Sequence, residues 1–482
     1  MDKMPTITIL QLNDLHGYLE PHPEHYWDGD HSVYRTAGGV ARISELFKEV
    51  REENPGGVIA LDNGDTIHGT YPVVTSEGRV LAPVLNELRL DGWTAHWDFA
   101  YGPKYLKEFS EKLGHPLLSI NCYQKDSDNL YFKPYTIIER HSVKIGVIGV
   151  AATIVDKVMP EKFSEGVRLT IGQNELRNWV KQLREEEKVD LVIMLSHNGF
   201  PQDMKMLGNV DGVDICLSGH THNRSREAVT ANKTIVIQSG CHGSFIGRID
   251  LSLGSRGVKS FEHKLIDVDM SIRPDPVVDE IVQRALEPHR EMLSERVGKT
   301  LTDLHRNLIM ESPMDNLLLQ ALIDITGAEI AFSNGWRYGA PVPIGPITVN
   351  DLWNTIPVNP PVSVCKIKGS EIKEMMEMNL ERTFSANPFE QMGGYVKRCL
   401  GINLYFKIEN PPDSRINRLF INGKPIDTNK TYRACYVTSQ GVRPEFGSDK
   451  ENLDIDAITA LRSYIEKHSP IDAALRNTIV PI

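Results

Sequence analysis

The sequence predicts a two-domain α/β protein, and three observations indicate it. The chain has 482 residues, and at about 150 residues per domain this length allows two to three domains that each bury a core. Up to about residue 270, short β-branched runs alternate with amphipathic helical windows, as in strands layered against helices. Beyond residue 297 the composition changes to mixed helices and strands with many Pro and Gly. We expect an N-terminal α/β domain at 1–272, a linker helix at 273–296 and a C-terminal α/β domain at 297–482.

The spacing of apolar residues predicts the elements of the N-terminal domain. Apolar residues recur at helical spacing in windows 39–53 and 173–188, which predicts helices that cover a sheet. Two X-Pro pairs in Arg273–Pro276 favour extended backbone and mark the boundary. The apolar spacing from Val277 predicts a connecting helix that bends at Pro288. The predicted strands are Thr6–Leu12, Val58–Leu61, Lys144–Val150, Asp190–Leu195 and Val213–Leu217.

Charge and hydropathy indicate the class of partner. Lys and Arg number 53 against 64 Asp and Glu, so the net charge is −11 and there is no basic footprint for a nucleic acid polymer or an anionic membrane. No stretch approaches the roughly 18 uninterrupted apolar residues of a spanning helix. We therefore expect a small-molecule substrate, with neither nucleic acid nor membrane as a partner.

The cysteines and the N-terminal stretch predict a cytoplasmic location. Six cysteines are spread along the chain without a C-x-x-C pair, which is typical of reduced thiols and argues against a zinc ribbon. Met1–Leu12 holds one lysine and a short apolar run, less than the apolar core of a signal peptide. A secretion signal removed ahead of this sequence stays open as an alternative.

Asp and His residues follow the predicted strands where each strand ends. In an open α/β sheet the loops beyond the carboxyl ends of parallel strands meet at one crevice, so these side chains are expected to lie together. Singly, each is more simply a turn or loop residue, but their joint occurrence favours a metal site. Imidazoles and carboxylates without thiolate suit Zn, Mn, Fe(II) or Co. These residues are Asp14 and His16, Asp65, His197, and His220 with His222.

The order Asp14-x-His16, Gly64-Asp65, His197 and Gly219-His220-x-His222 resembles the calcineurin-like metallophosphoesterases. The chain beyond residue 297 resembles the substrate domain of the 5′-nucleotidase family. The resemblance implies a four-layer β-sandwich flanked by helices, instead of a single doubly wound sheet, followed by a second α/β domain for the substrate.

The resemblance also implies two divalent metal ions, with Mn and Zn as the first candidates. Two such ions lower the pKa of a shared water and neutralise charge in an in-line displacement. By this resemblance Asp65 bridges both ions. Asp14, His16 and His222 hold one ion, and His197 and His220 hold the other.

One stretch departs from the family pattern. Where the family has an Asn ligand, a catalytic His and the Asp that orients it, this chain has His96, Trp97 and Ala100. His96 is still expected to ligate the second ion, but the indole N–H of Trp97 does not transfer a proton at neutral pH. Asp98 is a candidate replacement acid or base, with a cap or turn role as the equal alternative. General acid catalysis is worth roughly 10²–10⁴ in rate, so the departure leaves the substrate range open.

The C-terminal domain supplies the candidate substrate-binding residues. Asn334 and Arg337 match the family's phosphate loop loosely, and the guanidinium fork of Arg337 suits a phosphate or sulfonate oxyanion as a catalytic clamp. Phe389 matches the first base-stacking segment, with a core role as the even alternative. The second aromatic loop of the family is missing, and Phe446 is the candidate replacement.

These expectations lead to a metal-dependent phosphoric ester hydrolase that acts on nucleotides or related small phosphates, in nucleotide catabolism. Segment 96–102 and loop 335–339 also resemble the SoxB thiosulfohydrolases, so hydrolysis of a sulfonated or thiosulfonate conjugate is one alternative. A nucleotide-binding protein that has lost turnover is the other.

Overall fold

The computed structural model of this protein describes residues 6–254 and 257–482. Contacts divide the chain into two units, one formed by the residues up to Glu24 with Arg35–Pro288, the other by His25–Tyr34 with His289–Ile482. The division at Pro288 falls inside the segment expected as the linker, which holds helices α8 (Pro276–Leu286) and α9 (Arg290–Ser294).

None of the helices in the described ranges has the length and apolar content needed to cross a membrane. The first five residues of the stretch that suggested the absence of a leader lie outside the described residues. The cytoplasmic location stays a prediction.

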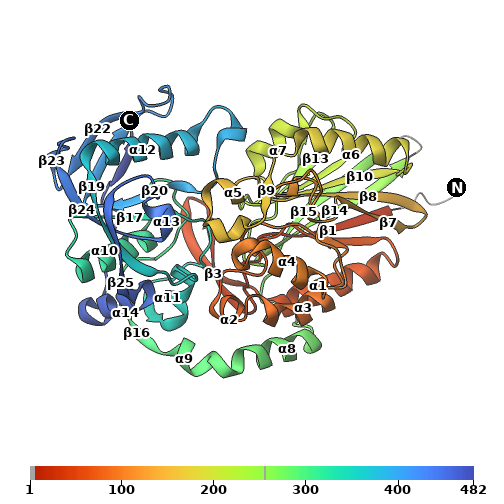
Figure 1. Ribbon diagram of the computed structural model, residues 1–482. Helices are drawn as coiled ribbons and strands as arrows, with labels where there is room; N and C mark the ends of the chain where they lie inside the picture. The colour runs from red at the N-terminus through yellow and green to blue at the C-terminus, as the bar shows by residue number, and fades with distance from the viewer. Residues whose placement is uncertain (1–5, 255–256) are drawn as a thin grey trace. The chain divides into compact units, whose positions relative to one another are not determined.

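Two sheets face each other in the first unit (Figure 1). The first sheet has the order β15-β14-β1-β4-β5, formed by Gly257–Asp267, Phe245–Gly254, Thr6–Leu12, Val58–Asp62 and Gly92–Trp93. The second has the order β12-β13-β11-β10-β8-β7, formed by Val229–Ala231, Thr234–Ile237, Ile215–Ser218, Leu191–Ser196, Val143–Val150 and Tyr135–Arg140. The strands expected from the sequence lie within two residues of their observed bounds.

Apolar side chains from both sheets form one buried core. Ile9 and Ile59 of the first sheet and Ile193 and Ile215 of the second belong to the same fully buried cluster. Helices α6 (Gln173–Glu185) and α7 (Phe200–Leu207) lie outside one sheet, and α1 (Val40–Glu53) and α3 (Ala82–Glu87) lie outside the other (Figure 1). The unit is therefore a helix–sheet–sheet–helix sandwich, and the single sheet favoured by strand–helix alternation alone is wrong.

A hairpin of β2 (Pro21–Asp28) and β3 (His31–Gly38) was not expected from the sequence. Its residues are largely polar and aromatic and show no clean apolar alternation, so the usual strand signal is missing.

The second unit is also α/β, as expected. Its main sheet has the order β20-β17-β24-β19-β25, formed by Tyr395–Leu400, Ile330–Gly335, Thr431–Val437, Pro361–Lys368 and Ser448–Asp456. A second sheet has the order β23-β22-β21-β26, formed by Lys424–Pro425, Ile416–Ile421, Ile402–Phe406 and Ile479–Pro481. The helices that accompany them include α10 (Pro313–Thr326), α12 (Gly369–Phe384) and α14 (Ala457–His468).

Candidate metal centre

The parallel strands of the two sheets end at the same site. Strands β1, β4 and β5 run parallel in the first sheet, and β8, β10 and β11 run parallel in the second. The side chain of Asn63, just after β4, donates hydrogen bonds to Ser196 O (2.8 Å) and Leu217 O (2.7 Å), so it ties this loop to the ends of β10 and β11. The residues that follow all these strands are thereby held at one end of the sandwich.

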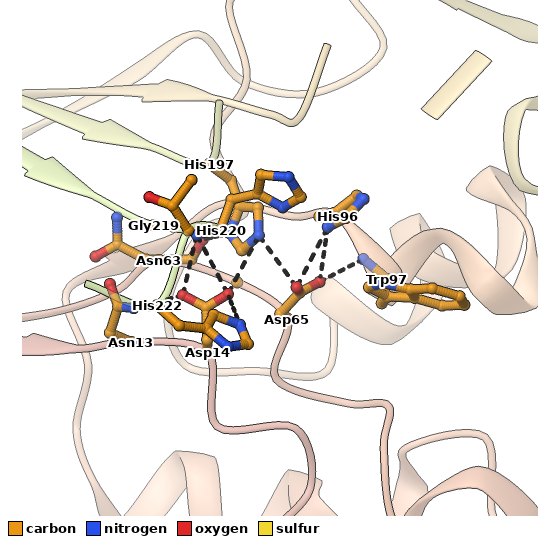
Figure 2. Close-up of polar contacts among 12 residues, drawn as sticks. Asn13, Asp14, Asn63, Asp65, His96, Trp97, His197, Gly219, His220 and His222 are labelled. Carbon is orange, nitrogen blue, oxygen red and sulfur yellow. Dashed lines mark hydrogen bonds and ion pairs between the residues drawn. The ribbon is translucent and has the colours of Figure 1, made fainter. Parts of the chain in front are cut away.

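The structure brings together all seven residues expected to bind metal, in two groups that share Asp65. Within each group the potential ligand atoms lie within 4.8 Å of one another. Figure 2 shows the side chains of His96, His197 and His222 grouped around the carboxylates of Asp14 and Asp65. The first group is Asp14, His16, Asp65 and His222, and the second is Asp65, His96, His197 and His220.

Five of these residues occupy the left-handed region of backbone conformation. Non-glycine residues adopt positive φ at a cost, and such residues concentrate at functional sites. The φ angles lie between 47° and 73° for Asp14, His16, Asp65, His220 and His222. Tight turns after the strands therefore aim these side chains inward.

The two carboxylates lie at the middle of the cluster. His222 Nε2 lies 3.2 Å from an oxygen of Asp14, and His197 Nε2 lies 3.2 Å from an oxygen of Asp65. Burial tends to raise the pKa of Asp65, but the imidazoles of His96 and His197 outweigh it and hold that pKa well below its usual value. Conversely, burial lowers the pKa of His197, but Asp65 and Asp14 raise it to about 10. The centre therefore favours positive charge beside its carboxylates.

The side chains fit divalent cations. The ring of His197 has Nδ1 2.5 Å from the carbonyl oxygen of Asn63, so this nitrogen is a donor and Nε2 is left for the cluster. His96 Nε2 is buried and forms no hydrogen bond to a described residue. A set of imidazoles and carboxylates without thiolate suits Zn, Mn, Fe(II) or Co and does not discriminate among them.

Trp97 forms an aromatic wall where the family pattern has a proton donor. Its backbone N–H donates to Asp65 Oδ1 (2.6 Å), and in Figure 2 the indole extends away from the histidine cluster. The indole stacks on His68 with ring centroids 4.8 Å apart, and it forms a T-shaped contact with the Phe163 ring at 5.7 Å. Its environment is aromatic, and it adds no titrating group.

The contacts of Asp98 favour the turn role, which the sequence left as the equal alternative to acid–base chemistry. Its carboxylate is fully buried and accepts four backbone hydrogen bonds, all between 2.9 and 3.1 Å. The donors are the N–H groups of Asp65, Thr66, Ile67 and His96. Asp98 therefore fixes the two loops that carry Asp65 and His96, as a turn-forming residue.

The candidate substrate residues lie in the second unit, with differing surroundings. Arg337 is half-buried, donates to Gly394 O (3.1 Å) and lies over the Tyr395 ring. Asn334 and Phe389 are half-buried, Asn334 near the end of β17 and Phe389 in a short 3₁₀ turn.

The structure corrects the expectation that Phe446 stacks on a base. Its ring is 4 % exposed and belongs to the hydrophobic core of this unit. A ring enclosed by core side chains has no face to offer a base. The missing second aromatic loop is therefore not replaced by Phe446.

Sequence reasoning missed Arg306. Its guanidinium is buried, pairs with Asp315 (2.9 Å) and lies 5.4 Å from the centre of the Trp336 ring, while Nη2 is bonded to no described residue. An isolated Arg in a loop gives no sequence signal of such burial, so only the fold reveals it.

Comparisons with known proteins agree with this geometry. Residues 7–224 match the calcineurin-like phosphoesterase family and residues 296–439 match the 5′-nucleotidase C-terminal domain. Protein UshA of Yersinia enterocolitica is 25% identical over 535 residues, covering 98% of this chain and 93% of that protein.

Two solved structures from Thermus thermophilus, each 22% identical, share the fold. The sulfate thiohydrolase SoxB has a TM-score of 0.92 and covers 100% of this chain and 98% of its own. A 5′-nucleotidase precursor has a TM-score of 0.87 and covers 99% of each chain. The chain thus belongs to the calcineurin-like phosphoesterases that carry a 5′-nucleotidase C-terminal domain, and is a metal-dependent phosphoric ester hydrolase.

Proposed function

We propose that this protein hydrolyses phosphoester bonds of nucleotides or related small phosphates with two divalent ions. The observation that carries the proposal is the pair of ligand groups that share the buried carboxylate of Asp65. Asp14, His16 and His222 would hold the first ion, and His96, His197 and His220 the second, with Asp65 between them. Two ions so placed would activate a water as the nucleophile and neutralise charge on the phosphoryl oxygens.

The protein's own residues fix this centre. Asn63 orients the His197 ring through its carbonyl oxygen, and the Trp97 N–H holds one oxygen of Asp65. Asp98 fixes the loops on both sides. Because Trp97 is no proton donor, we expect substrates whose leaving groups are stable without protonation.

We expect the C-terminal unit to supply the substrate-binding residues. The fork of N–H donors on Arg337 matches phosphate oxygens, and Asn334 adds an amide at the end of β17, just ahead of Arg337 in the sequence. Phe389 offers a half-buried ring for stacking on a base. The match to the 5′-nucleotidase C-terminal domain supports nucleotides as the substrate class.

A second candidate function is SoxB-like hydrolysis of a sulfonated or thiosulfonate conjugate. Trp97 favours it, because a sulfur leaving group needs no general acid.

One assay separates the two. Mn²⁺-loaded protein is incubated with nucleoside monophosphates, UDP-sugars, cyclic nucleotides and S-sulfonated cysteine, and released phosphate and sulfate are measured. Phosphate release is expected. Sulfate release without phosphate release would favour the SoxB-like reaction over phosphoester hydrolysis. Tight nucleotide binding with full metal content and no hydrolysis would identify a protein that has lost turnover.

A further inference from the structure

A third group of potential ligands lies beside the first metal group, formed by Glu24, Cys241 and His242. His242 is 3 % exposed, and its backbone N–H donates to Asp14 O (2.7 Å). Its φ is 60°, so it shares the left-handed backbone of five metal-binding residues. No role for this histidine follows from the sequence motifs.

The three residues do not form a separate metal site. The Glu24 carboxylate already accepts from Arg224 Nη2 (2.7 Å) and Ser244 Oγ (3.1 Å), and lies 3.2 Å from His242 Nδ1. Burial raises the pKa of the Cys241 thiol well above its usual value, so the thiol stays protonated. Glu24 is therefore a partner of the His242 ring and is not available as a ligand.

The contact with Glu24 determines what the other nitrogen of His242 offers. A carboxylate accepts hydrogen bonds only, so Nδ1 carries the proton and Nε2 carries a lone pair. Nε2 is buried and forms no hydrogen bond with any described residue. A buried acceptor without a donor or a cation is unfavourable, so this lone pair is expected to have a partner.

The first metal group lies next to this ring. The centroid of the His242 ring is 5.9 Å from that of His16 and 6.0 Å from that of His222, and these two centroids are 5.1 Å apart. The three imidazoles therefore form a triangle, and only His242 has no place yet among the ligands. A carboxylate behind a histidine is also the usual arrangement of a metal-binding imidazole.

We propose that His242 is a further ligand of the first ion, which it binds through Nε2, and that Glu24 is the positioning residue that orients its ring. The inference rests on the metal centre of the proposed function and extends the first group to five protein residues. The ligand is a divalent cation of the Mn²⁺ or Zn²⁺ type.

The test is the ion affinity of the full chain. Chelator-treated protein is titrated with Mn²⁺ by calorimetry, and bound metal is counted by elemental analysis. His242→Gln is expected to weaken one of the two sites about 10–100-fold and Glu24→Gln about tenfold, because such partners typically contribute this much. The other site keeps its affinity.

His115→Gln is the matched control. His115 is 4 % exposed and its Nε2 also lacks a partner among the described residues, but it belongs to none of the ligand groups found there. Its variant should bind both ions like the unmodified protein. Unchanged affinity in a folded His242 or Glu24 variant, or an equal loss in the His115 variant, would overturn the proposal.

A structure of the Zn²⁺-loaded unmodified protein tests the same inference without any variant. It should place His242 Nε2 about 2.1 Å from the first ion, and a separation beyond about 3 Å would refute ligation. All these measurements report ion binding, and none of them depends on turnover. Absence of phosphate release by a protein that binds both ions would therefore refute the proposed function and leave this inference intact.

Discussion

Asp98 offers a sharp test of the reasoning, because its two interpretations predict opposite results. Each carboxylate oxygen accepts two of the four backbone N–H groups, Oδ2 from Asp65 and His96, and Oδ1 from Thr66 and Ile67. In Asp98→Asn one carboxylate oxygen becomes an amide NH₂. This NH₂ group is a donor, so it cannot accept from the two backbone N–H groups that the oxygen bound. Whichever way the amide is turned, two hydrogen bonds are lost.

The expected cost follows from these contacts. Each lost hydrogen bond to a buried charged group is worth about 1–2 kcal/mol after partial relaxation, so the free energy of unfolding should fall by about 2–4 kcal/mol. Because the displaced N–H groups belong to the loops of Asp65 and His96, ion affinity should fall with it.

Two measurements on one preparation check this expectation. Chemical denaturation of the chelator-treated protein gives the free energy of unfolding, and elemental analysis after dialysis gives the ion content. Asp126→Asn is the control, since Asp126 is an exposed carboxylate of the same unit. Unchanged stability and ion content, with loss of turnover and of one limb of the pH–rate profile alone, would refute the positioning role and restore Asp98 as an acid or base.

Three further predictions concern other buried charges. Asp65→Asn should leave fewer than two ions per chain by elemental analysis, because a neutral amide is a poor shared ligand; full occupancy would contradict the shared-carboxylate centre. Asp315 is buried between two guanidiniums, so Asp315→Asn should lower the free energy of unfolding, measured by chemical denaturation, by about 3–5 kcal/mol. Glu329→Gln, at a half-exposed ion pair, should lower it by less than about 1 kcal/mol. Burial lowers the pKa of Lys397 to about 7 in the folded chain, below its value in the unfolded chain. Between these two pKa values the native state binds fewer protons than the unfolded state. The free energy of unfolding should therefore rise with pH from about 7 to 10. Lys397→Met should reduce this rise, and an unaltered pH dependence of its unfolding free energy would argue against the shift.

Local patterns predicted most of the candidate metal centre. The strand that ends at Leu12 and the strands before His197 and His220 are short β-branched runs, and their polar successors are visible in the sequence itself. Because parallel strands bring their carboxyl ends together, residue type at each strand end is sufficient to predict which side chains meet. Six of the seven candidate ligands came from this reasoning, and His96 came from the family resemblance.

Long-range contacts decided the rest. Whether the strands form one sheet or two depends on pairing between distant segments, and strand–helix alternation does not encode that pairing. Three of the four N–H groups that bind Asp98 lie 31 to 33 positions away, and Glu24 meets His242 across 218 positions. A carboxylate looks the same in sequence whether it meets solvent, a proton or four backbone donors. Only the folded chain fixes its surroundings, and the surroundings fix its chemistry.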